Sequence, residues 1–336
     1  MQVQQNYPLK KYNTFGIDVY AKYFSAFTTI DELTSLITYH SPLITLIIGG
    51  GSNLLFTKNY DGLVLKNEIK GIHTIHEDED HIYVKVGAGE NWHQFVMHCI
   101  KNNFSGVENL SLIPGNIGAS PMQNIGAYGV EVKEVFYSME AFHLKEKRII
   151  NFSVNDCEFG YRESVFKKKY KDQFVILTVT YRLNKKPQYN ISYVAIKEEL
   201  EKINANELSI QSVSQAVINI RRSKLPDPNV TGNAGSFFKN PEIPEDNFKI
   251  LKTKFENIVG FPLDNGNVKL AAAWLIEQCG WKGYRRGDAG CYEKQALVLV
   301  NYGNASGKEI YDLSEEIKQS VKEKFTVDLE REVNII

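Results

Sequence analysis

The stretch L-I-P-G-N-I-G-A-S-P-M-Q-N-I-G-A-Y-G-V-E, residues 112–131, is rich in glycine. It carries four glycines within a short span, at positions 115, 118, 126 and 129, together with several polar side chains. A simple turn does not need so many glycines and polar groups. We therefore interpret the stretch as a loop built to hold a ligand.

A second glycine run, G-G-G-S-N (residues 49–53), follows the apolar segment 43–48, which we expect to be a buried strand. Glycine backbone lets N–H groups approach a pyrophosphate closely, and Ser52 and Asn53 add polar contacts. The run lacks the G-x-G-x-x-G spacing of a Rossmann site, so a nucleotide bound here requires another fold. A tight turn without a ligand is the alternative.

The composition indicates a multidomain protein that handles small molecules. The length of 336 residues corresponds to two or three domains of roughly 100 to 200 residues each. With 39 basic and 40 acidic side chains the net charge is −1. We therefore expect neither nucleic acid nor a membrane surface as a partner, and no obligate protein partner is evident.

Three further features limit the class of protein. The segment M-Q-V-Q-Q-N-Y-P-L-K lacks a basic stretch followed by an apolar one, which predicts a cytoplasmic location. The four cysteines are widely spaced without C-x-x-C, so we expect reduced thiols. Three histidines flank the acidic run 77–80, but the alternating flanks predict an exposed hairpin turn rather than a metal site, and no metal is expected.

Periodicity predicts a mixed α+β chain, with the change between domains near Ile210. A β-branched and aromatic run predicts a strand at residues 174–182, and a second strand is expected at 296–301. Expected helices cover residues 92–101, 209–222, 268–279 and 307–325.

The stretch N-A-G-S-F-F-K-N-P, residues 233–241, sets Ser236 between a flexible Ala-Gly approach and an aromatic pair. The last of the seven histidines is His143, so a Ser-His pair would have to draw on the first half of the chain. Ser236 is therefore interpreted as a proton donor rather than a nucleophile. A loop entering a strand is the alternative.

Two more motifs, G-Y-R-E-S (residues 160–164) and L-E-R-E-V (residues 329–333), occur in order around this serine. Together with stretches 112–131 and 233–241 they resemble the UDP-N-acetylenolpyruvoylglucosamine reductase family, also called MurB, in its longer form. The resemblance begins at N-T-F-G-I-D (residues 13–18) and continues to the last residues, so it covers nearly the whole chain.

The resemblance implies an α+β fold with an FAD-binding domain of the vanillyl-alcohol-oxidase (PCMH) type in two lobes, residues 1–67 and 68–210. A smaller α+β substrate-binding domain (211–325) and a C-terminal strand returning to the active site (326–336) follow. Neither glycine loop contains a histidine or cysteine that could tether flavin, so FAD should be noncovalent. The implied flavin contacts are Gly49, Gly50, Gly51, Ser52, Asn53, Gly115, Ser120, Asn124 and Gly126.

Hydride addition to an enol ether conjugated to a carboxylate leaves negative charge that needs a nearby cation and a placed acid. The resemblance gives these roles to Arg162 and Ser236, and gives Glu332 the role of assisting protonation. A structural arginine paired with Glu163 or another carboxylate, and a charged surface strand around Glu332, are the alternatives. The family pattern is L-E-P-E-V, and Arg331 replaces its proline here.

Further polar residues match substrate-contact positions of the family. The tyrosine of I-S-Y belongs to a loop that closes over substrate in the longer form. Lysine and tyrosine side chains suit the diphosphate of a UDP-sugar. The implied substrate contacts are Tyr193, Lys224, Asn240 and Gln295.

The implied reaction is the NADPH-dependent reduction of UDP-N-acetylenolpyruvoylglucosamine to UDP-N-acetylmuramate in peptidoglycan precursor synthesis, with FAD carrying the hydride. An FAD oxidase of the same superfamily acting on an alcohol or sugar is one alternative, although it would usually need a base that the second half of the chain does not offer as histidine. A flavin or nucleotide-sugar binding protein without turnover is the other.

Overall fold

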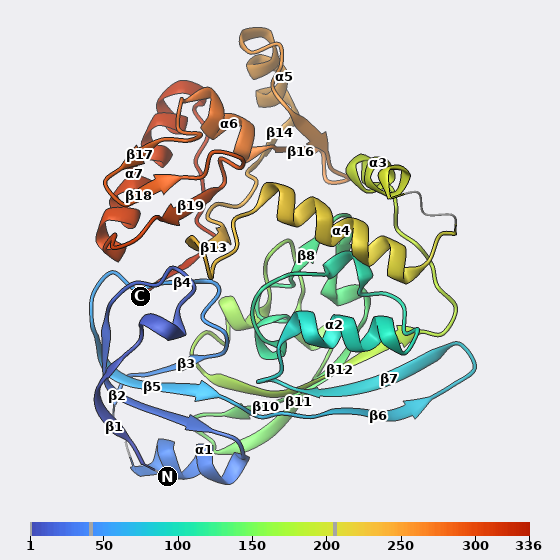
Figure 1. The fold of residues 1–336 in the computed structure, drawn as a ribbon, viewed down its shortest axis with the longest axis vertical. Coiled ribbons are helices and arrows are strands. Elements are labelled where there is room, and N and C mark those ends of the chain that lie inside the picture. Colours follow the sequence, from blue (N-terminus) through green and yellow to red (C-terminus); the bar gives the residue numbers. More distant parts are fainter. Residues whose placement is uncertain (1, 40–42, 204–206) are drawn as a thin grey trace. The chain divides into compact units, whose positions relative to one another are not determined.

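The computed structural model describes residues 2–39, 43–203 and 207–336. The chain forms two compact units, and each is assembled from separate segments (Figure 1). Unit 1 comprises Met1–Tyr7, Ala21–Gly50 and Asp61–Ser223, and unit 2 comprises Pro8–Tyr20, Gly51–Tyr60 and Lys224–Ile336.

The strands that build unit 1 are β1 (Gln4–Pro8), β2 (Tyr20–Phe27), β3 (Thr45–Ile48), β5 (Tyr60–Asn67), β6 (Ile72–Glu77), β7 (His81–Gly87), β8 (Gly126–Ala127), β9 (Val130–Glu131), β10 (Phe136–His143), β11 (Arg148–Ser153) and β12 (Phe174–Asn184). One sheet has the order β1-β2-β5-β3, with β3 parallel to β5. The other sheet has the order β11-β10-β12-β7-β6 and is antiparallel throughout. Strands β8 and β9 form a separate short pair.

The helices of unit 1 are α1 (Ile30–Tyr39), α2 (Trp92–Lys101), α3 (Val194–Lys202) and α4 (Ile210–Lys224). Helix α2 covers one face of the five-stranded sheet (Figure 1). Its apolar residues recur at the spacing of one helix face, so Trp92 and Phe95 both contact Tyr181 of β12 at ring distances of 5.8 and 4.9 Å. Helix α1 packs with β2 and β5 in a second cluster that also includes Phe142 and Leu177.

The strands of unit 2 are β4 (Leu54–Leu55), β13 (Gly232–Ser236), β14 (Glu242–Pro244), β15 (Gly260–Pro262), β16 (Asn267–Leu270), β17 (Arg285–Arg286), β18 (Ala289–Cys291), β19 (Val298–Asn301) and β20 (Asn334–Ile335). Its helices are α5 (Glu245–Lys254), α6 (Ala272–Gln278) and α7 (Gly307–Phe325). The main sheet has the order β13-β19-β18-β17, a smaller sheet has the order β14-β16-β15, and β20 pairs in parallel with β4.

Short 3-10 helices lie between these elements: η1 (Lys10–Tyr12), η2 (Glu108–Leu110), η3 (Ile117–Ala119), η4 (Val132–Glu134), η5 (Asn155–Cys157) and η6 (Val165–Lys167).

The early segment 13–18 belongs to unit 2 because it packs on the sheet that carries Ser236. The carbonyl of Thr14 accepts the amide of Asn233 at 3.0 Å, and the carbonyl of Phe15 accepts Nδ2 of Asn301 at 2.9 Å. A Cβ at Gly232 would lie 2.2 Å from the Phe15 carbonyl oxygen, so only glycine allows this approach.

Most predicted elements are confirmed. Helices α2 and α7 begin and end where the pattern predicts, and the acidic run 77–80 turns the hairpin between β6 and β7. The helix predicted at 268–279 is wrong in its first part. Residues 267–270 form β16, in which Val268 and Leu270 are buried in alternation with less buried neighbours, and the helix begins at Ala272.

The predicted domain change at Ile210 differs from the division into compact units. Helix α4 begins at this residue, yet unit 1 continues to Ser223. The reason is packing: Ile210 joins the large core of unit 1, while Val217 and Ile220 pack with α3.

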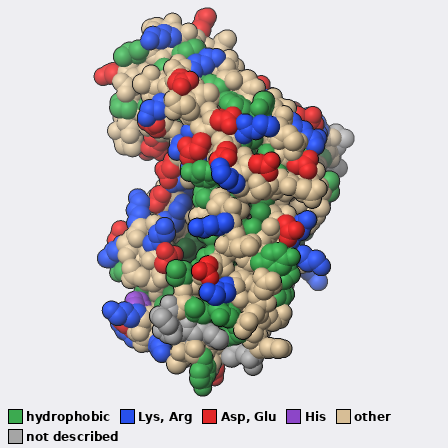
Figure 2. Space-filling view, turned by 90° about the vertical axis from the view of Figure 1, so that its left-hand side faces the viewer, with side chains coloured by type: hydrophobic (Ala, Val, Ile, Leu, Met, Phe, Trp, Pro, Cys, Tyr) green, Lys and Arg blue, Asp and Glu red, His purple; other side chains and the backbone are tan. Residues whose placement is uncertain are grey.

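The surface agrees with the small net charge. On the face drawn in Figure 2, acidic and basic side chains are interspersed. Within residues 2–39, 43–203 and 207–336, no helix combines the length and apolar character that a membrane crossing requires. The four cysteines are free thiols.

Candidate active site

The two glycine loops meet in unit 1. A Cβ built on Gly50 would lie 2.7 Å from Oδ1 of Asn116 and 3.1 Å from Cα of Gly115, and one on Gly49 would lie 3.2 Å from Cβ of Asn116. The backbone of Gly49 and Gly50 therefore packs on the Asn116 side chain and on Cα of Gly115, which a larger side chain would prevent. The predicted residues Gly49, Gly50 and Gly115 are brought together.

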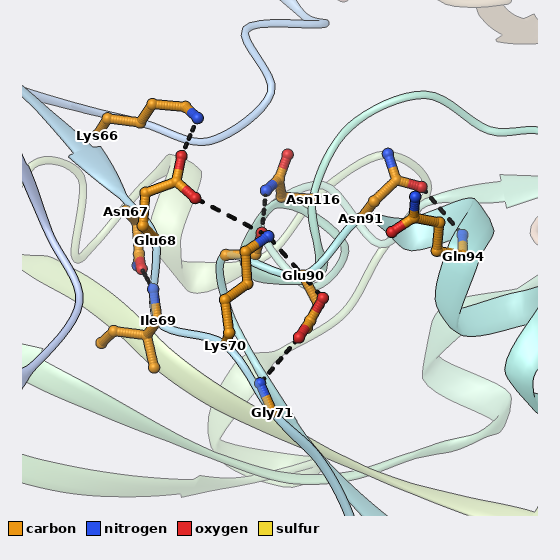
Figure 3. A network of polar contacts seen from close by, with 11 residues as sticks. Lys66, Asn67, Glu68, Ile69, Lys70, Gly71, Glu90, Asn91, Gln94 and Asn116 are labelled. Atoms are coloured by element: carbon orange, nitrogen blue, oxygen red, sulfur yellow. Dashed lines mark hydrogen bonds and ion pairs between the residues drawn. The ribbon is translucent and has the colours of Figure 1, made fainter.

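A network of polar contacts holds Asn116 of the long glycine loop to the segments that follow β5 and β7 (Figure 3). The carbonyl of Gly89 accepts from Nδ2 of Asn116 and from Nζ of Lys70. Lys70 lies 3.8 Å from the carboxylate of Glu90, and Glu90 accepts the amide of Gly71 at 2.8 Å. The network was not predicted, because its members come from three separate stretches of sequence.

Arg162 lies beside the second half of the long glycine loop. Its backbone has φ +54°, a left-handed conformation that costs a non-glycine residue free energy and often marks a functional position. The guanidinium donates to the carbonyl of Gly126 and lies 3.9 Å from a carboxylate oxygen of Glu131. A Cβ on Gly126 would lie 2.8 Å from Nη1, so this glycine makes room for the arginine.

Asn124 organises the same cluster from the interior. Its Nδ2 donates to Glu131 at 3.0 Å and to the carbonyl of Gly160 at 2.9 Å, and its Oδ1 accepts the amide of Lys133 at 3.1 Å. Glu131 also forms an ion pair with Lys133 at 2.9 Å. Glu131 lies inside the stretch 112–131, but it is not among the predicted site residues. One glutamate after a glycine run carries no signal of its own.

Ser120 is also committed to the interior. Its hydroxyl lies 2.7 Å from the hydroxyl of Tyr181, and both residues are buried. The side chains of Ser120 and Asn124 are therefore occupied within the protein. We expect a ligand contact at either position to involve backbone atoms.

Tyr193 lies where the I-S-Y segment meets the glycine loop. Its ring is 48% exposed and packs edge-on against Tyr128 at 5.3 Å. Nearby, Nδ2 of Asn190 donates to the carbonyl of Gly129 at 2.9 Å. Burial raises the pKa of Tyr128. A tyrosine at this depth stays protonated at neutral pH.

In unit 2, a β-bulge sets the direction of Ser236. Asn233 pairs with Val300 and Ser236 with Val298, so β13 holds one residue more than β19 over this interval. Gly235 within the bulge has φ +70°, and its amide donates to Oδ1 of Asn233 at 2.9 Å. The N-A-G-S sequence thus builds the irregular strand end that carries the serine.

Glu332 lies next to this strand end. Its amide donates to the carbonyl of Phe237 at 2.9 Å, and its own carbonyl accepts from Nδ2 of Asn53 at 3.2 Å. The amide of Asn334 in turn donates to the carbonyl of Asn53 at 3.1 Å. Three residues predicted from separate motifs, Asn53, Ser236 and Glu332, therefore occupy adjoining segments.

Gly51 of the first glycine run and Gln295, an expected substrate contact, both contact other parts of the protein. Gly51 has φ +63°, and a Cβ there would lie 1.9 Å from the carbonyl oxygen of Tyr12, so protein packing alone demands glycine. Oε1 of Gln295 accepts a hydrogen bond from the amide of Leu297 at 3.3 Å. The carbonyl of Leu297 in turn accepts from the amide of Phe237 at 2.7 Å.

Asn240 lies four residues after Ser236 in the sequence, and Lys224 lies twelve residues before it. Oδ1 of Asn240 accepts the amide of Ala272 at 3.0 Å, at the first residue of α6. Lys224 is the exposed last residue of α4. Ser52 is half-buried.

Arg162 belongs to unit 1, whereas Ser236 and Glu332 belong to unit 2.

Two family models match the chain. One, described as UDP-N-acetylenolpyruvoylglucosamine reductase, C-terminal domain, matches residues 227–336, and the other, described as FAD binding domain, matches residues 21–145. Proteins called UDP-N-acetylenolpyruvoylglucosamine reductase from Amoebophilus asiaticus and Flavobacterium johnsoniae are 51% and 48% identical to it, each alignment covering 100% of both chains.

The chain belongs to the UDP-N-acetylenolpyruvoylglucosamine reductase family. Identity of this size over the full length confirms the predicted family, the predicted FAD cofactor and the predicted oxidoreductase class. The crystal structure of MurB from Thermus caldophilus is similar with a TM-score of 0.71 at 22% identity, covering 100% of this chain and 99% of that one. That similarity concerns the fold, and it confirms an α+β protein with an FAD-binding domain and a smaller C-terminal domain.

The reductase fold offers a suitable place for FAD in the glycine loops of unit 1. Gly49 and Gly50 pack against the side chain of Asn116 and Cα of Gly115, so only glycine allows the two loops to lie this close. Backbone N–H groups in such glycine-rich loops suit the oxygens of a pyrophosphate. The residues present therefore fit the cofactor.

Proposed function

We propose that this protein reduces the enolpyruvyl group of UDP-N-acetylenolpyruvoylglucosamine to give UDP-N-acetylmuramate for peptidoglycan synthesis. The observation that carries the proposal is the hydrogen bond from the Glu332 amide to the carbonyl of Phe237, at 2.9 Å, because it joins the backbone of Glu332 to the residue that follows Ser236. Binding alone does not need an acid and a carboxylate on adjoining segments. The family membership supports the same reaction.

In this proposal bound FAD, once reduced by NADPH, supplies the hydride that adds to the enolpyruvyl methylene. Arg162 holds the substrate carboxylate with a two-pronged guanidinium and stabilises the charge that builds on it. Ser236 donates a proton to the carbon that bears the carboxylate, which completes the new C–H bonds as the double bond is lost. Glu332 assists this protonation.

The remaining assignments are also part of the proposal. Gly49, Gly50, Gly51, Ser52, Asn53, Gly115, Ser120, Asn124 and Gly126 contact FAD, which is noncovalent because residues 49–53 and 113–129 contain neither histidine nor cysteine. Residues 1–210 bind FAD, residues 211–325 bind the sugar nucleotide, and residues 326–336 return Glu332 to the site. Tyr193, Lys224, Asn240 and Gln295 contact the UDP-sugar.

An anaerobic spectroscopic titration tests the function. NADPH should bleach the yellow protein, and the enolpyruvyl UDP-sugar should then restore the colour while gaining two hydrogen atoms, which mass spectrometry detects. An oxidase would instead be bleached by an alcohol or sugar without NADPH. A binding protein would leave the flavin oxidised under both conditions.

Acid precipitation should release all flavin into the supernatant, and flavin in the pellet would contradict a noncovalent cofactor.

A further inference from the structure

Arg331 is anchored to one helix by three contacts. Its Nε donates to Oγ of Ser314 at 2.9 Å, its Nη2 pairs with the carboxylate of Glu315, and its guanidinium carbon lies 4.5 Å from the centre of the Tyr311 ring. All three partners belong to α7. The Arg331 side chain is only 15% exposed, so it lies against the helix rather than in solvent.

Helix α7 is a firm anchor. A capping box between Ser306 and Glu309 fixes its start, and its buried face includes Ile310, Ile317 and Phe325. Ser314 is buried, and its hydroxyl donates to the carbonyl of Tyr311 at 2.6 Å. The hydroxyl oxygen is therefore already oriented as an acceptor for Arg331.

The anchored residue directly precedes Glu332 on the paired strand. Arg331 faces Phe238, and two 2.9 Å bonds flank this pair, from the amide of Glu332 to the carbonyl of Phe237 and from the amide of Lys239 to the carbonyl of Glu330. Successive side chains of an extended strand point to opposite sides. Holding Arg331 on α7 therefore directs Glu332 away from that helix.

The opposite side of the strand is fixed as well. Nζ of Lys239, a side chain that is only 7% exposed, bonds to the carboxylate of Glu330 at 2.6 Å. The strand is thus tied on both sides at the two residues before Glu332. Rotation or slippage of the strand would break at least one of these contacts.

The backbone pattern at position 331 is compatible with the proline of the family pattern L-E-P-E-V. The two bonds around the Arg331–Phe238 pair use the amides of Glu332 and Lys239, so neither requires an N–H at position 331. Proline would stiffen this backbone by fixing φ. Arginine stiffens it by a different route, through its side chain.

We propose that Arg331 is a positioning residue, which holds the segment of Glu332 in register on the strand end that carries Ser236, through Tyr311, Ser314 and Glu315. The proposal rests on the proposed function, in which Glu332 assists protonation. Because a displacement of about 1 Å can cost about 100-fold in rate, loss of the anchor should slow the step that uses Glu332. It should leave flavin reduction by NADPH unchanged.

The test compares Arg331→Met, which removes the three contacts, with Arg331→Pro, which restores backbone stiffness without them. Stopped-flow spectroscopy measures flavin reduction by NADPH and reoxidation by the UDP-sugar for each variant, and thermal unfolding checks the fold. We expect about 10- to 100-fold slower reoxidation in Arg331→Met. Arg331→Pro should recover most of that loss, and both should be reduced at the wild-type rate.

Arg286→Met is the matched control. Arg286 forms an ion pair of 2.8 Å with Glu316, also on α7, but it lies on β17. Its loss should leave reoxidation unchanged. A similar loss in the control would show that α7 merely needs its ion pairs, and would overturn the proposal.

Other outcomes also decide the question. Wild-type reoxidation in Arg331→Met, equal slowing of both half-reactions, or Arg331→Pro folded but no faster than Arg331→Met would each refute a positioning role. If the UDP-sugar fails to reoxidise the reduced wild-type protein, the proposed function itself fails. The two failures are therefore distinguishable.

Discussion

The amide of Glu332 donates a 2.9 Å hydrogen bond to the carbonyl of Phe237, the residue that follows Ser236. Together with the bond from the amide of Lys239 to the carbonyl of Glu330, it joins the C-terminal segment to the chain that follows β13, although the two are far apart in sequence. Asn53, from the first glycine run, completes the junction by donating to the carbonyl of Glu332 at 3.2 Å. Ser236 and Glu332, for which we propose the roles of proton donor and assisting carboxylate, thus lie on neighbouring backbone segments.

Ser236→Ala should separate the two half-reactions. Flavin reduction by NADPH needs no proton at the substrate carbon, so its rate should stay close to that of the wild type. Reoxidation by the UDP-sugar should fall by about 10² to 10⁴, the usual contribution of a positioned acid. Stopped-flow absorbance of the flavin measures both rates.

Ser236→Cys keeps a proton to donate and should recover part of the loss. Equal slowing of both half-reactions in the alanine variant would assign the proton to another group.

Arg162→Lys should lose most turnover even though the charge is kept. Lysine cannot present two parallel N–H donors to a carboxylate, and it would replace a side chain that donates to the carbonyl of Gly126. Steady-state kinetics should show a fall of at least about 10-fold in kcat/KM, which corresponds to about 1.4 kcal/mol. Arg148→Lys, at an exposed arginine paired with Glu146, is the control and should be neutral. Near-normal activity of Arg162→Lys would return this arginine to a structural role.

Sequence patterns predict the bounds of those helices whose ends depend on neighbouring residues. Helix α2 has the predicted bounds, and the structure shows that regular apolar spacing and the Asn91 cap fix them locally. Helix α7 likewise begins at the Ser306–Glu309 capping box. In contrast, Val268 and Leu270 were assigned to a helix, since a short apolar run before a true helix has no period of its own.

The arrangement of the candidate site depends on contacts that sequence alone does not display. Motifs and family resemblance selected Arg162, Ser236 and Glu332, but not the partners that hold them. Glu131 beside Arg162 and the anchor of Arg331 on α7 join residues from different elements. Segment 13–18 joins unit 2 for the same reason, since pairing across the chain has no local signature.

Tyr193→Phe should weaken binding of the UDP-sugar more than it alters flavin reduction, because the hydroxyl is assigned to the sugar diphosphate. We expect KM for the UDP-sugar to rise several-fold, as for one lost hydrogen bond of about 1 kcal/mol. Tyr137→Phe is a matched control: Tyr193 and Tyr137 are both 48% exposed, and each packs edge-on against another tyrosine. Equal effects of Tyr193→Phe on the NADPH and UDP-sugar half-reactions would contradict the assignment.

The thiols should react in the order of their burial. Cys99, Cys157 and Cys291 are buried, and burial raises the pKa of Cys157 and of Cys291 to about 12. Alkylation requires the thiolate, so these groups should resist iodoacetamide at pH 8. Mass spectrometry should find at most Cys279 modified quickly in the native protein and all four cysteines modified in denaturant. Rapid modification of a second thiol in the native state would contradict the described core.

A double-mutant cycle between Gly50 and Asn116 tests the meeting of the two glycine loops. A Cβ at position 50 would lie 2.7 Å from Oδ1 of Asn116, so Gly50→Ala should push the loops apart and lower FAD occupancy. Asn116→Ala removes that oxygen but also the bond to the Gly89 carbonyl, so it should weaken FAD binding by itself. In the double variant the clash with Oδ1 is absent, and the loss should be smaller than the sum of the single losses by about 0.5 to 3 kcal/mol. The residual loss reflects the 3.1 Å approach to Cα of Gly115, which no change at position 116 relieves.

Fluorescence titration of the apoprotein with FAD measures each binding free energy. Strictly additive losses would show that the two loops do not meet as described.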